Sequence, residues 1–152
     1  MQSLTIDTGM KEYLINNHAV LRFNPSDPNL YHRFFAAATK LDALDAELTE
    51  QLKALPEADD TARAELGLAL LTDYDHRIKA LLTEIFGGEN DFDKMLEGVN
   101  LAGTGANGKR VVQNLLDALT PILQDGAAQH LQTAAANARA EADAARAARE
   151  QA

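Results

Sequence analysis

The feature that most constrains this chain is a proline-containing junction at residues 24–28, because it separates two kinds of sequence pattern. Asn24 precedes a proline, a position that disfavours helical backbone, so a strand is predicted to end there. Asp27 is placed to accept hydrogen bonds from the first amides of a helix, and Pro28 suits the first helical position. The junction therefore predicts strands before it and a helix after it. The alternative reading is a binding loop.

The segment before the junction carries strand patterns. Apolar and polar residues alternate in Leu4–Asp7, and two short apolar runs follow at Tyr13–Ile15 and Ala19–Phe23. Asp7–Gly9 and Asn16–His18 have turn composition. We expect a small antiparallel hairpin or meander within residues 3–23. Since so small a sheet is marginal alone, it should pack on a helix or add to the edge of a neighbour.

The segment after the junction is predicted to be helical at residues of about 28–55, 61–86, 90–97 and 109–124. The first of these has apolar residues every three or four positions, which is typical of a helix that packs lengthwise on another. Pro56 should stop it, and Gly87 should cap the second helix. The predicted class is mainly α with a small N-terminal antiparallel sheet (α+β), built on a long antiparallel helical hairpin.

The last part of the chain changes in composition at residue 127. Residues 1–126 are predicted to form a single globular α+β domain, in which Pro121 kinks the last helix and Asp125–Gly126 breaks it. Residues 127–152 are rich in alanine and carry little apolar bulk, so we expect a helical C-terminal extension. It is either exposed and fraying or an assembly helix.

Composition excludes several kinds of site. The chain has 152 residues, no cysteine and a net charge of −9. Disulfides and thiolate metal sites are therefore excluded, and non-specific nucleic-acid binding is disfavoured. No apolar run is long enough to cross a membrane, and the first residues do not resemble a signal peptide. We expect a cytoplasmic protein with no membrane or nucleic-acid partner.

Acidic residues gather between Leu41 and Asp60. This segment holds seven carboxylates (Asp42, Asp45, Glu47, Glu50, Glu57, Asp59 and Asp60) and one lysine, Lys53. Such a run is usually a solvated helix face. The alternative is a surface that meets a basic partner or imitates a nucleic acid.

The segment Gly103–Arg110 matches two phosphate-binding patterns, G-x-G-x-x-G and G-x-x-x-x-G-K. The first pattern requires a preceding strand, which residues 92–101 do not offer. The second requires Ser or Thr after the lysine, and Arg110 stands there. We therefore predict a flexible loop, capped at Asn107, and no nucleotide cofactor.

No catalytic or metal-binding constellation is evident. None of the four histidines (His18, His32, His76 and His130) is spaced as a helical metal pair, although His32 and His76 lie on the two long predicted helices and could meet. No pair of carboxylates is isolated among apolar residues, and no nucleophile motif is present. We expect a chain that is not an enzyme and has no catalytic, cofactor or metal residues.

The order of features resembles a known family. A short sheet ends in Phe23–Pro28 and is followed by the helical hairpin, by Ile85–Gly88, by a turn at Leu96–Asn100, and by a helix with Leu115–Ile122. In this order the chain is similar to the small tail assembly chaperones of long-tailed phages and prophages of Gram-positive bacteria. The resemblance covers residues 4–123 and leaves out the alanine-rich tail.

The resemblance implies a non-enzymatic protein of the host cytoplasm. Members of that family coat the long tape measure protein until tail tube subunits polymerise around it. The implied partners are thus the tape measure protein and possibly the tail tube protein, with homo-oligomers also possible. Two alternatives remain open on the residues alone: a small acidic inhibitor of a host defence system, and a structural subunit of the virion.

Overall fold

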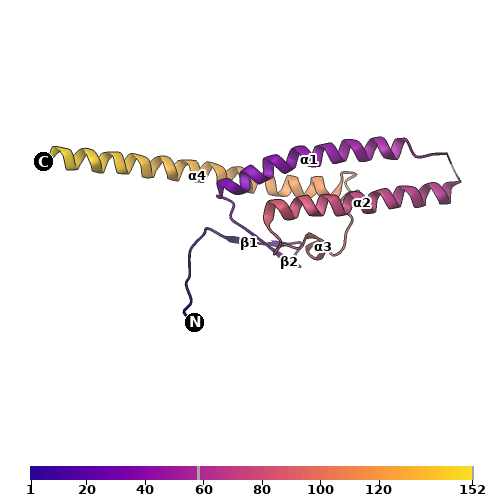
Figure 1. Cartoon of the computed structure of the whole chain (residues 1–152), viewed down its shortest axis with the longest axis horizontal. Helices are drawn as coiled ribbons and strands as arrows, with labels where there is room; N and C mark the ends of the chain where they lie inside the picture. The colour runs from indigo at the N-terminus through magenta and orange to yellow at the C-terminus, as the bar shows by residue number, and fades with distance from the viewer. Residues whose placement is uncertain (58, 152) are drawn as a thin grey trace.

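The computed structural model describes residues 1–57 and 59–151. In chain order it contains β1 (Lys11–Ile15), β2 (Ala19–Phe23), α1 (Pro28–Lys53), α2 (Asp60–Phe86), α3 (Phe92–Met95) and α4 (Val111–Glu150). The helices α1 and α2 form a long antiparallel hairpin, and the first part of α4 runs beside it (Figure 1). The two strands and α3 lie together against one end of this hairpin. The predicted fold class is confirmed.

The sheet has two strands, and the predicted third strand at Leu4–Asp7 is wrong. β1 pairs with β2 in antiparallel register, with Tyr13 opposite Leu21. Asn16 and Asn17 have φ of 50° and 57°, as expected for asparagines in a tight turn. Residues 1–10 have no regular structure. The Asn24 side chain holds the Thr8 carbonyl at 2.6 Å, so the chain before β1 is fastened beside the end of β2.

The ends of α1 and α2 follow local chemistry. The Asp27 carboxylate accepts from the Asn29 amide at 2.9 Å, and Pro28 is the first helical residue, as predicted. α1 ends at Lys53, two residues before the predicted end, because Leu55 precedes Pro56 and is disfavoured in helical backbone. α2 begins at Asp60 after an Asp59 cap, and Gly87 ends it with φ of 96°.

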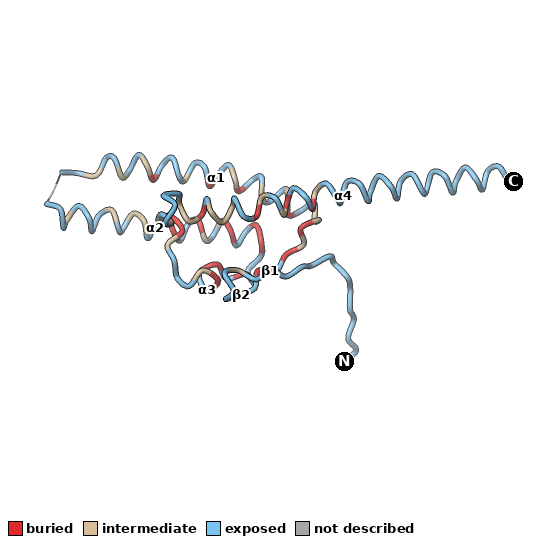
Figure 2. The backbone as a smooth tube through the Cα atoms, turned by 180° about the vertical axis from the view of Figure 1, so that it is seen from behind, coloured by how far each residue is buried: buried red, intermediate tan, exposed pale blue. Residues whose placement is uncertain are grey.

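The core lies where α1, α2 and α4 meet the two-stranded sheet of β1 and β2 (Figure 2). The predicted stripe on α1 faces inward, and its buried members are Leu30, Ala37, Leu41 and Leu48. From α2 the core takes Tyr74, Ile78, Leu82, Ile85 and Phe86. Burying each aliphatic or aromatic side chain contributes about 1.5–3 kcal/mol. Arg33 connects the start of α1 to the end of α2, since its Nε donates to the Ile85 carbonyl at 3.0 Å.

Two buried polar side chains, Asn90 and Asp75, connect loops to this core through contacts with residues distant in the sequence. Asn90 bonds both backbone groups of Arg22: its Oδ1 accepts from the amide at 2.9 Å and its Nδ2 donates to the carbonyl at 2.8 Å. The Asp75 carboxylate accepts from the buried Leu101 amide at 2.7 Å and from Lys79 Nζ at 2.9 Å. Asp75 thereby joins α2 to the segment between α3 and α4.

The helix α4 is longer than predicted. It begins at Val111, and it continues through Pro121 and Asp125–Gly126 to Glu150. The predicted break at Gly126 is wrong because this glycine serves packing: it is buried against the Pro25 carbonyl, with no room for a Cβ. α3 is also shorter than the predicted helix at residues 90–97, since Asn90 is engaged with β2 and Asp91 caps the helix.

Candidate protein-binding surfaces

The segment Gly103–Arg110 is a folded loop whose backbone groups bond to one another. The Gly105 amide donates to the Lys109 carbonyl at 2.8 Å, and the Val111 amide donates to the Gly103 carbonyl at 2.9 Å. The predicted cap at Asn107 is wrong, because α4 begins after Arg110. Asn107 instead accepts from the Lys109 amide and bonds to Asn114 within the loop. The amides that a phosphate would require are thus partly engaged. The element directly before the loop is the helix α3, and not the strand that the dinucleotide-binding pattern requires.

The two cations of this segment are also engaged internally. Lys109 pairs with Asp117 on α4 at 3.4 Å. The Arg110 guanidinium pairs with Asp45 on α1 and donates to the Ala102 carbonyl at 2.7 Å and to Thr49 Oγ1 at 3.2 Å. Arg110 therefore links the loop to α1 and contributes to the packing of α4.

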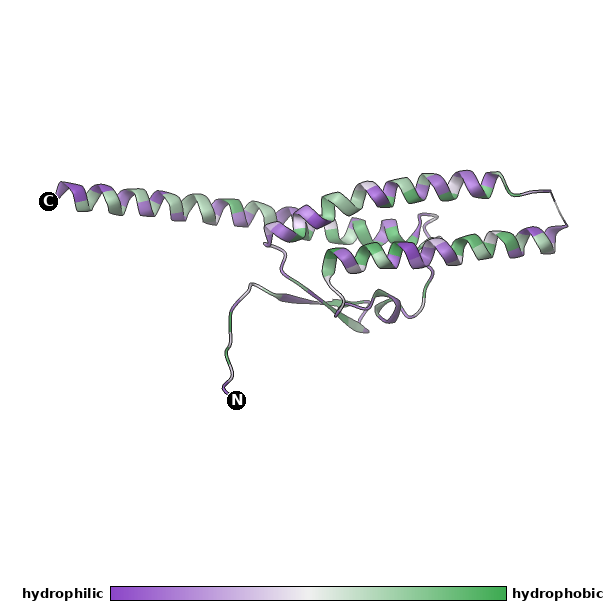
Figure 3. Ribbon diagram, in the orientation of Figure 1, coloured by the Kyte–Doolittle hydropathy of each residue, from purple (hydrophilic) through white to green (hydrophobic). Residues whose placement is uncertain are grey.

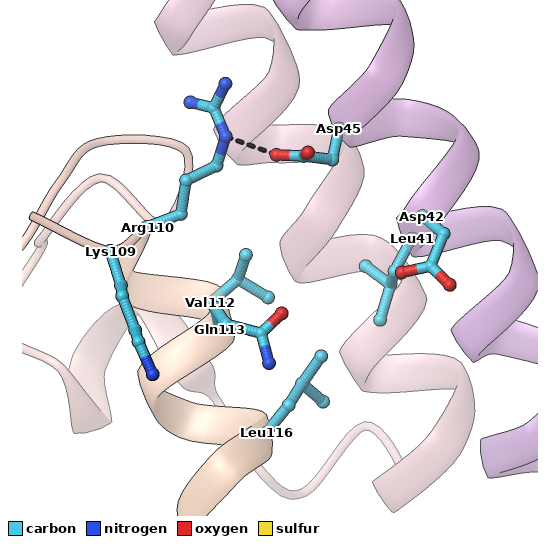
Figure 4. Close-up of a pocket in the computed structure, with 8 residues that line it drawn as sticks. All are labelled: Leu41, Asp42, Asp45, Lys109, Arg110, Val112, Gln113 and Leu116. Atoms are coloured by element: carbon cyan, nitrogen blue, oxygen red, sulfur yellow. Dashed lines mark hydrogen bonds and ion pairs between the residues drawn. The ribbon is translucent and has the colours of Figure 1, made fainter.

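A cavity of about 350 Å³ lies between α1 and α4 beside this arginine (Figure 4). Its apolar wall consists of Leu41, Val112 and Leu116. Its polar rim carries two acidic residues, two basic residues and one amide: Asp42, Asp45, Lys109, Arg110 and Gln113. Because the charges balance and one acid–base pair is already closed, the cavity offers no net field for a charged ligand.

The acidic segment of α1 is largely paired within the chain. Beyond Asp45, Glu47 lies 3.9 Å from Arg77 and Glu50 lies 3.7 Å from Lys53. The Asp59 carboxylate caps α2 by accepting from the Ala62 amide at 2.8 Å. This arrangement agrees with the prediction of a solvated helix face.

The histidines are dispersed over the surface. All four are exposed, and His18 lies 3.5 Å from Glu97. Across residues 1–57 and 59–151, no group of three or more His, Cys, Asp or Glu side chains is arranged to hold a metal ion. The structure does not bring His32 and His76 into any such group.

An apolar opening outside the core runs along the α1–α2 hairpin. It has a volume of about 420 Å³, and its lining comes only from these two helices: Lys40, Ala43, Leu44, Arg77, Ala80 and Leu81. We call it the α1–α2 groove. Its floor is small or aliphatic, and both of its charged residues are basic. Farther along α2, Leu66 and Leu68 are also exposed.

The second part of α4 projects from the body as an isolated helix (Figures 1 and 2). Every residue from Ala128 to Gln151 is exposed, including Leu131, whose side chain is 69% accessible. Purple and green alternate along this helix without a wide green face (Figure 3), so it has little to bury against a partner except alanine methyl groups. We call residues 128–151 the projecting helix.

The described helices include none that combines the length and apolar character needed to cross a bilayer. Comparison with known proteins identified no matching family model, no similar curated protein and no similar solved structure.

Proposed function

We propose that this chain is a non-enzymatic tail assembly chaperone of a long-tailed phage, which binds the tape measure protein in the host cytoplasm. The proposal combines the resemblance of residues 4–123 to that family with one feature of the structure, the α1–α2 groove. A long helical protein with repeated apolar stripes is the partner that such a groove suits, because two adjacent helices present a channel for a third.

The chemistry of the groove supports a helical protein partner rather than a small molecule. Ala43 and Ala80 leave room for a helix backbone to approach, while Leu44 and Leu81 offer apolar contact. The groove has no carboxylate among its lining residues, and Arg77 is held by Asp73 at 2.9 Å. Nothing in it provides the convergent polar groups by which small ligands are oriented.

The negative net charge of the chain also supports the role of a chaperone. A net charge of −9 keeps a complex with an aggregation-prone apolar partner in solution. The tail tube protein is a second proposed partner, since members of the resembled family coat the tape measure protein until tail tube subunits polymerise around it.

The test is co-expression with the tape measure protein encoded by the same phage, with recovery of that protein in the supernatant as the readout. The substitution Ala80→Arg places a long charged side chain in the groove at an exposed position, so we expect recovery to fall at least about tenfold. The matched control is Ala64→Arg, which makes the same change at an exposed α2 position outside the groove lining.

Equal recovery with both variants would exclude the groove as the binding surface. Failure of the wild-type chain to bind or solubilise the tape measure protein would reject the function itself. A host-defence inhibitor would instead lose its target when the acidic face is reversed by Asp42→Lys and Glu50→Lys, and a virion subunit would be detected in purified particles by mass spectrometry.

A further inference from the structure

The outer edge of β1 is available for strand pairing. In antiparallel pairs, opposite residues alternate between those that bond each other and those whose backbone groups point outward. Arg22 gives both its amide and its carbonyl to Asn90, so Arg22 and its partner Glu12 form an outward-pointing pair. By the same alternation, the amides and carbonyls of Glu12 and Leu14 point away from β2. In the part of the chain that the structure describes, no other residue bonds them.

The two edges of the sheet are therefore unequal. Asn90 covers the β2 edge in the manner of a one-residue strand, and α3 packs on the same side. The β1 edge has no such cover among the described residues. Open edges of this kind pair readily with another strand, and proteins that do not use them usually block them with charge, proline or a bulge.

A groove of about 460 Å³ lies beside the β1 edge. It is lined by Leu14, Ile15 and Asn16 on the hairpin side, with no residue of β2, and by Val111, Leu115 and Ala118 on the α4 side, among others. Because the side chains of Leu14 and Ile15 point to opposite faces of the sheet, a groove that touches both runs along the edge. A strand placed there would form backbone hydrogen bonds with β1 and would pack one row of its side chains against α4.

The N-terminal arm has the sequence that this groove requires. Leu4 and Ile6 would share one face of a strand, and Thr5 and Asp7 the other. The arm extends from the body (Figure 1), with Leu4 86% and Ile6 75% accessible. Four residues in extended form span about 13 Å, which is enough to pass both Glu12 and Leu14. The sequence thus encodes a strand that the isolated chain leaves without a partner.

The arm cannot easily reach the edge of its own β1. Its last part is fastened beside the end of β2, where Asn24 Nδ2 donates to the Thr8 carbonyl at 2.6 Å. Gly9 adopts a φ of 81° there, and the Asp7 carboxylate accepts from the Gly9 amide at 2.9 Å. To turn back along β1, the chain would have to give up these contacts at the end of β2.

We propose that Leu4–Asp7 of one copy adds as a third strand to the β1 edge of a second copy. Leu4 and Ile6 enter the groove against Leu115 and Ala118, while Thr5 and Asp7 face solvent. This pairing makes the chain a strand-exchanged oligomer. Its formation requires no phage partner, so the inference goes beyond the proposed function.

The first test measures association of the purified full chain by sedimentation velocity across a concentration series. We expect a concentration-dependent oligomer, and we expect Ile6→Asp to raise its dissociation constant at least about a hundredfold, since a buried contact is replaced by a charge. Thr5→Asp is the matched control, because it makes the same change on the solvent face of the arm and should weaken association less than about threefold. A chain that stays monomeric at every concentration, or an oligomer equally weakened by both variants, would overturn the proposal.

The second test locates the new strand by hydrogen exchange. In the oligomer the amides of Glu12 and Leu14 should exchange at least about tenfold more slowly than in the Ile6→Asp chain, whereas the Lys11 and Tyr13 amides, on the β2 side, should change little. Ala118→Arg should abolish this protection by filling the groove, and Ala128→Arg on the projecting helix should not. Protection of Glu12 and Leu14 that survives Ala118→Arg or is lost with Ala128→Arg would contradict the assigned groove.

Discussion

Two helical glycines in this chain should respond in opposite directions to the same substitution. Replacing glycine by alanine in a helix interior gains about 1 kcal/mol from backbone entropy when the new methyl group has room. At Gly67 a Cβ would lie 3.7 Å from Leu55 Cδ1, which is ordinary contact. At Gly126 it would lie 2.6 Å from the Pro25 carbonyl carbon and 2.9 Å from the Tyr31 hydroxyl, with the Pro25 oxygen closer still.

The expected magnitudes follow from these distances. Gly67→Ala should stabilise the chain by about 1 kcal/mol. Gly126→Ala must push α4 away from a backbone carbonyl that cannot rotate aside, and overpacking of this kind costs about 1–3 kcal/mol. With the upper value and the helix gain subtracted, the net loss is about 2 kcal/mol. For a chain of this size, melting temperatures should rise by about 2–4 °C for Gly67→Ala and fall by about 4–8 °C for Gly126→Ala.

The assay is urea unfolding followed by helical circular dichroism, with thermal melts as a second reading. The two variants share one chemistry, so the difference between them removes the general effect of alanine on helix propensity. If Gly126→Ala proved as stable as the wild type or more stable, the close approach of α4 to the residue 24–28 junction would be refuted.

Three further predictions concern the polar contacts and the projecting helix. Asn90→Ala leaves both backbone groups of Arg22 without their bonds, so unfolding free energy should fall by about 2–3 kcal/mol in urea titrations; a loss below about 0.5 kcal/mol would contradict this. The hydrogen bond from Lys79, at 2.6 Å, lowers the pKa of Asp93 below its ordinary 3.8. The stability that this contact contributes is therefore present above pH 3.8 and is lost as the pH falls through the lowered pKa of Asp93 in the folded state. Asp93→Asn should therefore show a shallower loss of stability below pH 4 than the wild type. Identical acid profiles of the two chains would contradict this prediction. Removal of residues 131–152 should reduce helical dichroism yet change the melting temperature of the body by less than about 2 °C, since these residues are exposed wherever they are described; a larger drop would show that the body depends on them.

The parts of the fold that depend on neighbouring residues were predictable from the sequence. The Asp27 cap and Pro28 start of α1, the Asn16–Asn17 turn and the Gly87 end of α2 each rest on backbone chemistry within a few positions. The inward stripe of α1 was predictable for a similar reason, because the helical repeat alone places those residues on one face.

The parts that depend on distant contacts were not predictable. Gly126 has the composition of a helix break, and only the Pro25 carbonyl, a hundred positions away in the chain, explains why a glycine sits inside α4. Leu4–Asp7 has the pattern of a strand, but a pattern specifies which faces a strand would show and not whether an edge is within reach. Nothing in the sequence near Asn90 or Asp75 indicates that their side chains bond the backbone of β2 and of Leu101.

The candidate surfaces show the same division. Apolar residues at helical spacing predicted that α1 and α2 would pair, but which alanines and leucines remain open in the α1–α2 groove depends on where α4 packs. The glycine-rich segment before α4 matches the sequence patterns of phosphate-binding loops. Its observed hydrogen bonds, which join backbone groups within Gly103–Val112, depend on the folded conformation of the loop and not on the pattern of glycines.

The measurement that tests the proposed function most directly is a pulldown of the tagged chain from phage-producing cells, with the partners identified by mass spectrometry. The proposal predicts that the tape measure protein is recovered with the wild-type chain and with Ala64→Arg, and is lost with Ala80→Arg. Recovery of a host defence protein, or of mature tail components without the tape measure protein, would contradict it.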